Sequence, residues 1–450
     1  MEKIVIQPKT IDISMQTNVL VVGGGPAGIG AAVSAARNGQ SVILLEKRGF
    51  LGGNITACFV ENCNYFLKGT GFSSEGIYNE IERKVYEKYG NDNVRERNKF
   101  AFSSEYLKVF LDEFVSEAGV QILFHSFVND VVMDGRQIAA VIIQTKKGPV
   151  AVKADIVIDT TGDADVAFAA GVPFEQGREK DGLCQPGTVS LRLAGADTEA
   201  LLKDGDRLLE IGRIFKEDYR AGKTGLPCKR QDLPFGRLTG GGQISYVNYS
   251  CVYGLDPTDI RDLSRGEMEC RQYVMDIYKY LKSHFTELKD TEVASIAPEI
   301  GFRDSRRIDG LYHLTIEDME GRKHFDDVIA VFPRFYDMLA PDANMDGDGK
   351  VEGKGYVGHI YEPVVDDRTF EIPYRTMVPK AVDNLLTAGR CISADHVAES
   401  GTRAISLCMM TGEAAGAAAA VAIRSGKKPA DICVPELQKI LISQNIKLPL

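Results

Sequence analysis

The sequence predicts an α/β fold in which a parallel sheet, extended by an antiparallel meander, is interrupted by an inserted α+β domain. The first observation is a β-α-β pattern, with the apolar run 18–22, a glycine-rich turn, an alanine-rich stretch and the apolar run 41–45. The second is an alternation of apolar runs with Asp-Gly and Lys-Gly turn signals across residues 120–152. The third is the return of the first pattern late in the chain, where a short strand at 384–388 precedes a long helix of small residues.

Length, charge and cysteine usage exclude several classes of protein. At 450 residues, the chain is long enough for two or three domains that each bury a core. Its 53 basic and 63 acidic residues give a net charge of −10, which argues against nucleic acid as a partner. The cysteines form no C-x-x-C pair and the first ten residues lack an apolar signal core, so we expect a cytoplasmic location. The most apolar stretch, 414–423, is too short to cross a bilayer, so we expect no membrane contact.

The turn after the first strand has the spacing Gly23-x-Gly25-x-x-Gly28. The first glycine permits the tight turn, the second lets a pyrophosphate approach the backbone, and the third permits close packing of helix on strand. Glu46 ends the next strand, 18 residues after Gly28, where a carboxylate can accept both ribose hydroxyls of an adenosine and disfavours a 2′-phosphate. The strand before the turn, the helix after it, Gly39 at the end of that helix and Glu46 all occur at the expected positions. We therefore predict a Rossmann-like dinucleotide-binding unit rather than a structural glycine turn.

The elements that follow are predicted from their apolar spacing. Two amphipathic helices are expected around residues 75–89 and 104–117, and the antiparallel meander at about 120–153. Residues 155–159 return to a continuous apolar strand. Its end, Thr161-Gly162-Asp163, is typical of a strand tip that meets a ligand.

The domain boundaries follow from changes in pattern. Beyond Gly187 the chain changes to charged helices and aromatic-bearing strands, and near Ile372 the first pattern resumes. We therefore predict a discontinuous dinucleotide-binding domain of residues 1–187 and 372–450. A substrate or cap domain of residues 188–371 is inserted between its two parts.

The β-α-β unit alone does not distinguish FAD from NAD, because both carry the same ADP half. Three further segments offer backbone to an extended ligand: Gly52-Gly53-Asn54, Thr161-Gly162-Asp163 and Gly389-Arg390. A long, flavin-sized ligand suits three such contacts.

Four stretches spread over nearly the whole chain resemble FAD-dependent oxidoreductases with a glutathione-reductase-type (GR2-like) FAD domain: EKRGFLGGN, FRDSRRIDGLYHLTIEDMEGRK, NLLTAGRCISADHVAESGTRA and TGEAAGAAAAVAI. The chain is most similar to a poorly characterised, bacterial-type branch. The resemblance implies FAD as the cofactor, with the glycine turn on the ADP moiety and the late Gly-Arg strand end near the ribityl-pyrophosphate. By position, the cofactor-binding residues are then Gly23, Gly25, Pro26, Ala27, Gly28, Glu46, Lys47, Gly52, Gly53, Asn54, Val128, Thr161, Gly162, Asp163, Gly389, Arg390 and Gly401.

The candidate catalytic residues are His396, Glu399 and Arg403. His396 and Glu399 fall between the flavin-contacting strand end and the helix predicted from about Thr402, where either can face the substrate and relay a proton. Arg403, in the first turn of that helix, can add positive charge at the N1/O2 edge of the flavin. Each residue also has a simpler interpretation: a loop histidine, a capping carboxylate and a solvent-facing arginine.

A second basic cluster consists of Arg303, Arg306 and Arg307 in the segment FRDSRR. Such a cluster can clamp a substrate carboxylate, which would favour an acidic small molecule. An ion-paired surface face is the interpretation that the pattern favours.

Cys58 and Cys63 have the spacing of the redox disulfide in pyridine nucleotide-disulfide reductases. However, Cys58 comes five residues after Gly53 rather than two, and no second Gly-x-Gly-x-x-Gly follows. We therefore predict that these cysteines are buried and structural.

An acidic segment resembles the first half of a calcium loop, with oxygen-bearing residues at Asp342, Asn344, Asp346 and Asp348. Its twelfth position is Gly353, where a bidentate glutamate is expected. We predict an acidic turn and no metal site, with a structural cation as the alternative.

Together these features predict an FAD-dependent oxidoreductase that transfers a hydride between flavin N5 and a small organic substrate. The alternatives are a non-redox use of the fold, as in thiazole synthesis or tRNA modification, an NAD-dependent dehydrogenase, and a flavin-binding electron-transfer subunit. The resemblance and the apolar segments of the central domain also lead us to expect a homodimer.

Overall fold

Two kinds of strand pairing meet on one long strand, β6. One side of β6 pairs in parallel with β1. On its other side, the first residues of β6 pair antiparallel with β5, and its last residues pair in parallel with β19 (Leu385–Thr387). In spatial order the sheet runs β3 (Gln121–Leu123), β2 (Val42–Leu45), β1 (Ile13–Val22), β6 (Gly148–Asp159), β5 (Gln137–Thr145) and β4 (Phe127–Asp134). The predicted parallel sheet with an antiparallel meander is therefore confirmed.

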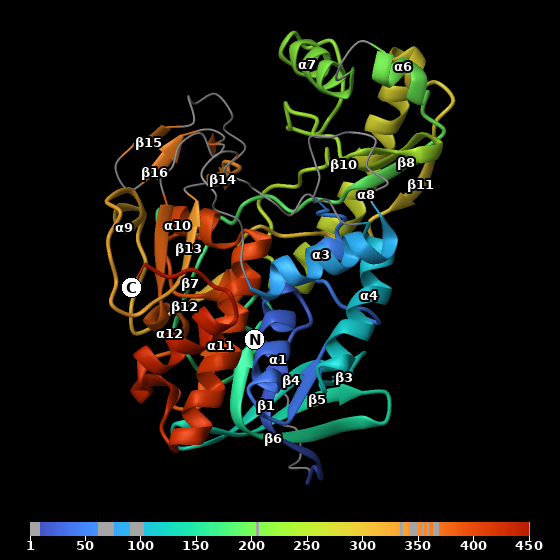
Figure 1. Cartoon of the computed structure of the whole chain (residues 1–450). Helices are drawn as coiled ribbons and strands as arrows, with labels where there is room; N and C mark the ends of the chain where they lie inside the picture. The colour runs from blue at the N-terminus through green and yellow to red at the C-terminus, as the bar shows by residue number, and fades with distance from the viewer. Residues whose placement is uncertain are drawn as a thin grey trace.

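The computed structural model describes residues 10–61, 76–90, 103–203, 207–333, 336–342, 350–352, 355–357, 360–362 and 369–449. Within these ranges β2 and β19, and the carboxyl-terminal halves of β1 and β6, are apolar and largely buried between layers, as is typical of α/β sheets. The helices against the sheet are α1 (Pro26–Arg37), α4 (Ser104–Glu117) and α11 (Ile405–Ser425) (Figure 1). Helix α3 (Ile77–Tyr89) packs on these helices, and α12 (Val434–Ser443) packs on α11.

Helices α1 and α11 lie against each other with backbone in contact. A Cβ atom added at Gly412 would lie 1.9 Å from the carbonyl oxygen of Ala27, and one at Gly416 would lie 2.2 Å from that of Ala31. Only glycine leaves room for so close an approach, because real Cβ atoms do not come that near to backbone. The contact joins the amino-terminal β-α-β unit to the carboxyl-terminal segment.

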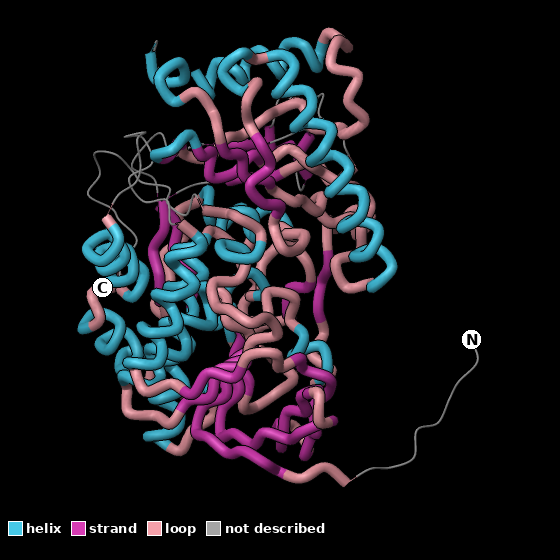
Figure 2. The backbone as a smooth tube through the Cα atoms, turned by 90° about the vertical axis from the view of Figure 1, so that its right-hand side faces the viewer, coloured by secondary structure: helices cyan, strands magenta, loops and turns pink. Residues whose placement is uncertain are grey.

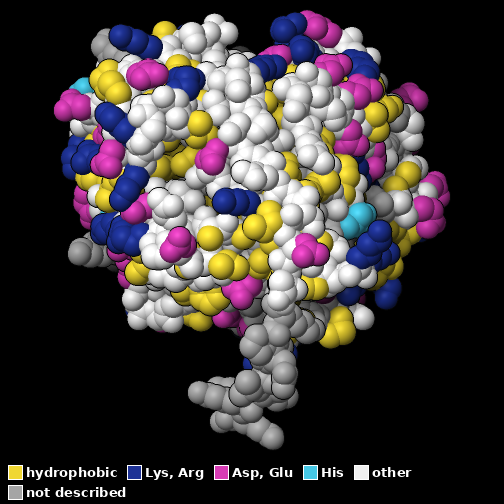
Figure 3. Space-filling model, turned by 90° about the horizontal axis from the view of Figure 1, so that it is seen from below, with side chains coloured by type: hydrophobic (Ala, Val, Ile, Leu, Met, Phe, Trp, Pro, Cys, Tyr) yellow, Lys and Arg dark blue, Asp and Glu magenta, His cyan; other side chains and the backbone are white. Residues whose placement is uncertain are grey.

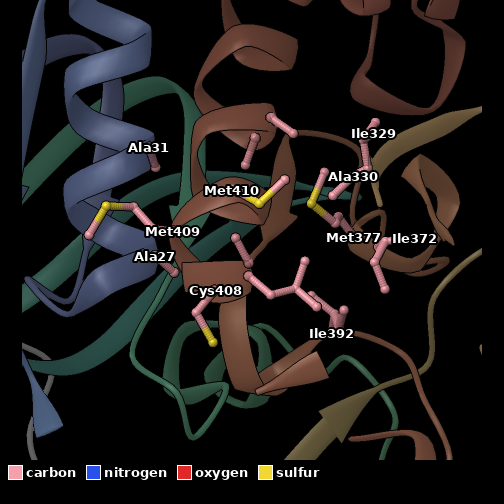
Figure 4. Packing of buried hydrophobic residues seen from close by; sticks show 14 of the residues in the cluster. Ala27, Ala31, Ile329, Ala330, Ile372, Met377, Ile392, Cys408, Met409 and Met410 are labelled. Carbon is pink, nitrogen blue, oxygen red and sulfur yellow. The ribbon is translucent and has the colours of Figure 1, made fainter. Parts of the chain in front are cut away.

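The other side of α11 is covered by two antiparallel strands, β13 (Val328–Pro333) and β18 (Thr369–Pro373). Met410 points from α11 toward Ile329 and Ala330 (Figure 4). By length and composition, α11 qualifies as a membrane span, the one such helix among the described residues. Since 94% of the most apolar 18-residue stretch of this helix is buried inside the protein, core packing accounts for its composition.

Residues 188–302 form a sheet and helices of their own, at the upper right of Figure 1 and at the top of Figure 2. This segment buries a hydrophobic cluster separate from the one around α11. Arg192 anchors it to the rest of the chain through an ion pair with Glu61 at 2.6 Å, and its guanidinium lies 3.7 Å from the ring centre of Phe59. Its elements are β8 (Leu191–Ala194), α6 (Thr198–Lys203), α7 (Arg207–Arg220), β9 (Leu238–Thr239), β10 (Gln243–Val247), α8 (Ile260–His284) and β11 (Glu292–Ile296).

Shorter elements connect the two hydrophobic clusters. The residues from Leu314 to Met338 that are buried belong to the cluster around α11. How the chain divides into domains at 187/188 and 371/372 stays a prediction. The connecting elements are α2 (Asn54–Ala57), α5 (Asp165–Ala169), β7 (Phe174–Gln176), β12 (Arg306–Ile308), α9 (Ile316–Glu320), β14 (Tyr336–Met338), β15 (Lys350–Glu352), β16 (Gly355–Val357), β17 (Ile360–Glu362) and α10 (His396–Thr402).

The face of the molecule seen from below carries charges of both signs. Lys and Arg side chains are interspersed there with Asp and Glu, and apolar side chains are scattered among them (Figure 3). This mixture agrees with a modest net charge of −10 over 450 residues. That the protein has no nucleic-acid partner stays a prediction.

Replacing Gly416 by alanine tests the contact between α1 and α11. The new methyl group would meet the carbonyl oxygen of Ala31, so the helices must move apart. We expect the free energy of unfolding, measured by urea denaturation, to fall by about 1–3 kcal/mol, even though alanine is the better helix former. Ser425→Ala near the end of the same helix is the control and should change it by less than about 1 kcal/mol. An unchanged unfolding midpoint for Gly416→Ala would contradict the tight contact.

Candidate functional site

The carboxyl ends of β1, β2, β6 and β19 open onto a cavity of about 340 Å³. In open α/β sheets this edge is where ligands bind. Glu46 follows β2, and Gly389 follows β19, three strand spacings away across the sheet. Three spacings are about 14 Å, so a ligand that reaches both residues must be long. The structure thus brings together the segments that the sequence analysis selected at both ends of the sheet.

The amino end of α1 forms one wall of the cavity. Gly25 precedes the helix, and a Cβ added there would meet its nearest neighbour, the Cα of Gly53, at 3.8 Å. Room for a ligand is therefore left beside the backbone N–H groups of the first helical turn, which attract anions. Gly28 has a different role, because its Cβ would lie 1.7 Å from the carbonyl oxygen of Gly23. The predicted residues of this turn that line the cavity are Gly23, Gly25, Pro26 and Ala27.

Glu46 lies at the cavity and is almost fully buried. Its Oε2 accepts a hydrogen bond from the backbone N–H of Gly24 at 2.7 Å, and its Oε1 accepts from that of Arg48 at 2.8 Å. A carboxylate oxygen has two lone pairs, so Oε2 keeps one for a ribose hydroxyl. Lys47 and Val128 line the same part of the cavity, as predicted from the resemblance.

The strand tip after β6 is held by a buried carboxylate. Asp159 accepts hydrogen bonds from the backbone N–H of Thr161 at 3.0 Å and from that of Ala167 at 2.9 Å. Burial raises the pKa of Asp159, and these hydrogen bonds oppose the rise. They fix the turn in which Thr161, Gly162 and Asp163 face the cavity.

Arg390 joins this strand tip to the end of β19. Its Nε donates to the carbonyl oxygen of Gly162 at 2.9 Å, and its Nη2 forms an ion pair with Asp163. Its Nη1 donates to the carbonyl oxygen of Phe302. Two predicted segments, 161–163 and 389–390, are therefore in direct contact.

The glycine pair after Glu46 meets the first glycine turn. Gly53 has φ 55° and ψ −130°, a conformation that favours glycine, and its missing side chain lets its backbone lie against Gly25. Gly53 and Asn54 line the cavity. Gly52 does not line it and instead donates its N–H to the carbonyl oxygen of Gly24 at 2.8 Å.

The structure places the candidate catalytic residues at different depths. Arg403 lines the cavity, whereas His396, Glu399 and Gly401 of α10 do not. His396 is fully buried, with its Nδ1 3.1 Å from Oδ2 of the equally buried Asp304. The Oε2 of Glu399 lies 3.9 Å from Nε of Arg403, behind the cavity wall. The catalytic roles of these residues stay predictions.

Glu399 sits in a cluster of buried charges. Burial raises its pKa to about 8. The positive charge of Arg403 lowers this pKa, the negative charge of Asp304 raises it, and the more distant Arg307 and Arg390 lower it. At neutral pH the protonated form of Glu399 therefore predominates.

The arginines of the FRDSRR segment do not form an ion-paired surface face, so that interpretation is wrong. Arg307 is 1% exposed and donates to the carbonyl oxygens of Ala394 and Gly177. Arg306 is also buried and pairs with Asp165 at 3.2 Å. Arg303 lines the cavity. The spacing of three arginines did not reveal this burial, because it arises from strands that are distant in sequence.

Cys58 is buried, as predicted. Burial raises the pKa of its thiol to about 11, so the reactive thiolate is disfavoured. Cys63 lies outside the described residues.

Part of the acidic segment can be placed. Asp342 accepts a hydrogen bond from Arg178 at 3.0 Å, whereas Asn344, Asp346 and Asp348 lie outside the described residues. In the described ranges, no group of three or more His, Cys, Asp or Glu side chains is placed to hold a metal ion.

Several cavity residues come from the segment 188–302 and were missed. They lie on or near α8 and β11, far from the glycine turn in sequence. No spacing in the sequence links them to that turn, so only the folded arrangement identifies them. They are Pro257, Leu263, Glu267, Glu299 and Ile300.

A known family matches nearly the whole chain. The family model described as FAD dependent oxidoreductase matches residues 18–441. The match includes both parts of the predicted dinucleotide-binding domain and the segment between them.

Individual relatives are distant. A thiamine thiazole synthase of Aeropyrum pernix is 27% identical over 161 residues, which are 33% of this chain and 55% of that protein. Digeranylgeranylglycerophospholipid reductase 2 of Methanothermobacter thermautotrophicus is 26% identical over 246 residues, 52% of this chain and 61% of that protein. The chain thus spans less than two thirds of the length of these relatives.

Solved structures resemble this one only loosely. A geranylgeranyl bacteriochlorophyll reductase-like protein of Thermoplasma acidophilum gives a TM-score of 0.46 at 14% identity, covering 96% of this chain and 84% of that one. The flavin-dependent brominase Bmp2 gives 0.46 at 13% identity, covering 96% and 84%.

Glu399→Gln tests the protonation of this buried carboxyl. In the unfolded chain the group ionises above about pH 4.5, whereas in the folded protein it keeps its proton to about pH 8. The unfolded state therefore binds fewer protons between these values, and Glu399 lowers stability progressively as the pH rises from 4.5 to 8. We expect the variant to have a Tm several degrees above that of the unsubstituted protein at pH 8, with a smaller difference at pH 5.

The measurement is thermal unfolding at several pH values, with Glu436→Gln as the control. Glu436 lies half-exposed on α12, paired with Arg424. Its replacement should shift the Tm little at any of these pH values. An equal Tm difference for Glu399→Gln at pH 5 and pH 8 would show that Glu399 is already ionised in the folded protein.

Proposed function

Because this chain belongs to the FAD dependent oxidoreductase family, we propose that it binds FAD in the cavity described above and uses it to oxidise or reduce a small organic molecule. The observation that supports this most strongly is the cavity itself. It reaches from the amino end of α1 and Glu46 across the sheet to Arg390 and Arg403. A dinucleotide in extended conformation suits such a span.

The residues on the cavity wall fit the parts of FAD. The open space beside Gly25, where a Cβ would intrude, suits the pyrophosphate at the amino end of α1. Glu46, with a lone pair left on Oε2, suits the adenosine ribose. Gly162, Asp163 and Arg390 form the part of the wall at the ends of β6 and β19. This part suits the remaining half of the dinucleotide.

Bound FAD supplies a hydride acceptor or donor at flavin N5. The chain contributes positive potential at the end of the cavity remote from Glu46. Arg403 lines the cavity there, and the amino end of the 21-residue helix α11 reaches it at Ile405. Both stabilise negative charge on a bound ligand.

Location and assembly are part of the proposal rather than of the family assignment. The cysteines in the described residues are free and all but one are buried, which agrees with the cytoplasmic location predicted from the sequence. The homodimer also stays a prediction. Light scattering tests it, since a monomer has a mass of 49.3 kDa.

The visible absorption spectrum of the purified protein tests the proposed cofactor. We expect a flavin band that moves to the supernatant after acid precipitation, and reduction of the flavin by substrate in the absence of oxygen. A colourless protein that also fails to take up added FAD would overturn the proposal. It would favour NAD as the occupant of the glycine turn.

Two alanine substitutions separate ligand binding from packing. Gly25→Ala meets no backbone closer than 3.8 Å, so the fold should persist while the methyl group obstructs the pyrophosphate. We expect FAD affinity, measured by fluorescence titration, to fall at least about tenfold, which is about 1.4 kcal/mol. Gly28→Ala overlaps the backbone of Gly23, so we expect it to lower the Tm itself. Full FAD affinity in Gly25→Ala would place the pyrophosphate elsewhere.

A further inference from the structure

Each carboxylate on the cavity wall is paired with an arginine. The partners belong to several elements and lie at the wall or just behind it. Among the described residues the pairs are Glu46 and Glu299 with Arg48, Asp163 with Arg390, Asp165 with Arg306, and Glu267 with Arg271. Every carboxylate of the wall therefore has an arginine partner, although Glu46 and Glu299 share Arg48.

Arg303 is the converse case, a cation at the wall without a carboxylate. Among the described residues, no Asp or Glu carboxylate oxygen lies within 4 Å of its guanidinium nitrogens, the limit for an ion pair. Its Nη1 donates instead to two neutral acceptors, the carbonyl oxygen of Pro186 at 3.3 Å and Oγ1 of Thr188 at 3.5 Å. A guanidinium has five N–H donors, so most of those of Arg303 are available to a ligand.

Neighbouring charges act on Arg303 in both directions. Burial lowers its pKa, the negative charge of Asp337 opposes this effect, and the positive charges of Arg230 and Arg403 lower the pKa further. Arg230 is compensated by Asp232, which accepts from Nε of Arg230 at 3.2 Å and from its Nη2 at 3.1 Å.

Arg403 adds a second positive charge at the cavity wall. Its nearest carboxyl, Glu399 at 3.9 Å, is mainly protonated at neutral pH, and its Nη2 donates to a neutral carbonyl oxygen, that of Asp337. A partly buried charge without a carboxylate partner is unfavourable, so an anionic ligand would stabilise this pair of arginines.

Arg303 lies on a different segment of the wall from the residues proposed to hold the pyrophosphate. It follows Phe302, whose carbonyl oxygen accepts from Nη1 of Arg390 and, at 3.5 Å, from Nδ2 of Asn54, so it lies near Arg390 and the start of α2. The cavity wall also includes the apolar residues Ile300, Phe302 and Ile405. A cation beside an apolar wall suits a molecule with both a carboxylate and a hydrocarbon part.

We infer that Arg303, together with Arg403, binds the carboxylate of an anionic organic substrate at this end of the cavity. The inference rests on the proposed function, because it takes this end of the cavity as the place where substrate meets the flavin. The planar guanidinium matches a carboxylate through two parallel hydrogen bonds, and this pairing orients the substrate as well as holding it.

Benzoate and its neutral analogue benzamide are the probes for this site. We would titrate each into the FAD-loaded protein and follow both the flavin absorption spectrum and the heat of binding. Benzoate should bind saturably and perturb the flavin spectrum, and benzamide should bind at least about tenfold more weakly.

Three variants identify the residue responsible. Arg303→Gln should weaken benzoate binding roughly 10- to 100-fold. Arg303→Lys should have a benzoate affinity between those of Arg303→Gln and the unsubstituted protein, because lysine keeps the positive charge but lacks the two parallel N–H donors of the guanidinium. Arg265→Gln removes a charge from exposed α8, where Arg265 pairs with Asp262, and should leave the affinity within about twofold.

The outcomes separate this inference from the proposed function. If the protein holds FAD but binds benzamide as tightly as benzoate, or if Arg303→Gln binds benzoate as well as the unsubstituted protein, the inference is wrong and the proposed function stands. If Arg303→Gln does not fold, unchanged benzoate affinity in Arg303→Lys has the same meaning. A loss of FAD affinity in Arg303→Gln with unchanged benzoate binding would assign this arginine to the cofactor. Failure of the unsubstituted protein to hold FAD would overturn both.

Discussion

The close contact between α1 and α11 determines where the rest of the site can be. It holds the amino end of α1, which carries the first glycine turn, next to the segment that leads from Gly389 to the start of α11. Gly412 and Gly416 permit this approach because any side chain there would meet the backbone of α1. The helix pair thus helps to fix the walls at the two ends of the cavity relative to each other.

Behind the cavity wall lies a layer of ionisable groups that, apart from Arg403, do not line the cavity. His396 with Asp304, Glu399 with Arg403, and Arg307 with backbone carbonyls connect α10 to the segment before β12. Away from water such interactions are stronger than at the surface, and they are unfavourable if left incomplete. This layer therefore keeps Arg403 in place at the cavity wall.

The sequence predicted the parts of the fold that depend on local spacing. The glycine turn, Glu46, the meander and the late Gly-Arg segment could be recognised because each has a pattern of its own within a few residues, and the family assignment confirms the fold class and FAD. The wall contributed by Pro257, Leu263 and Glu299 could not be recognised, because these residues meet the glycine turn only after the segment 188–302 has folded over it. The burial of Arg306 and Arg307 was also missed, because it arises only in the folded chain and because arginines are usually exposed.

The pairing of β6 with β19 has a consequence for how the protein acquires its structure. Leu385 pairs with Val157, 228 residues earlier in the chain. During synthesis the sheet can therefore be completed only after the whole intervening segment has left the ribosome, whereas the cluster of residues 189–302 forms from contacts closer in sequence. Until then the edge of β6 that receives β19 is open to other strands, and a chaperone that shields it would favour correct assembly.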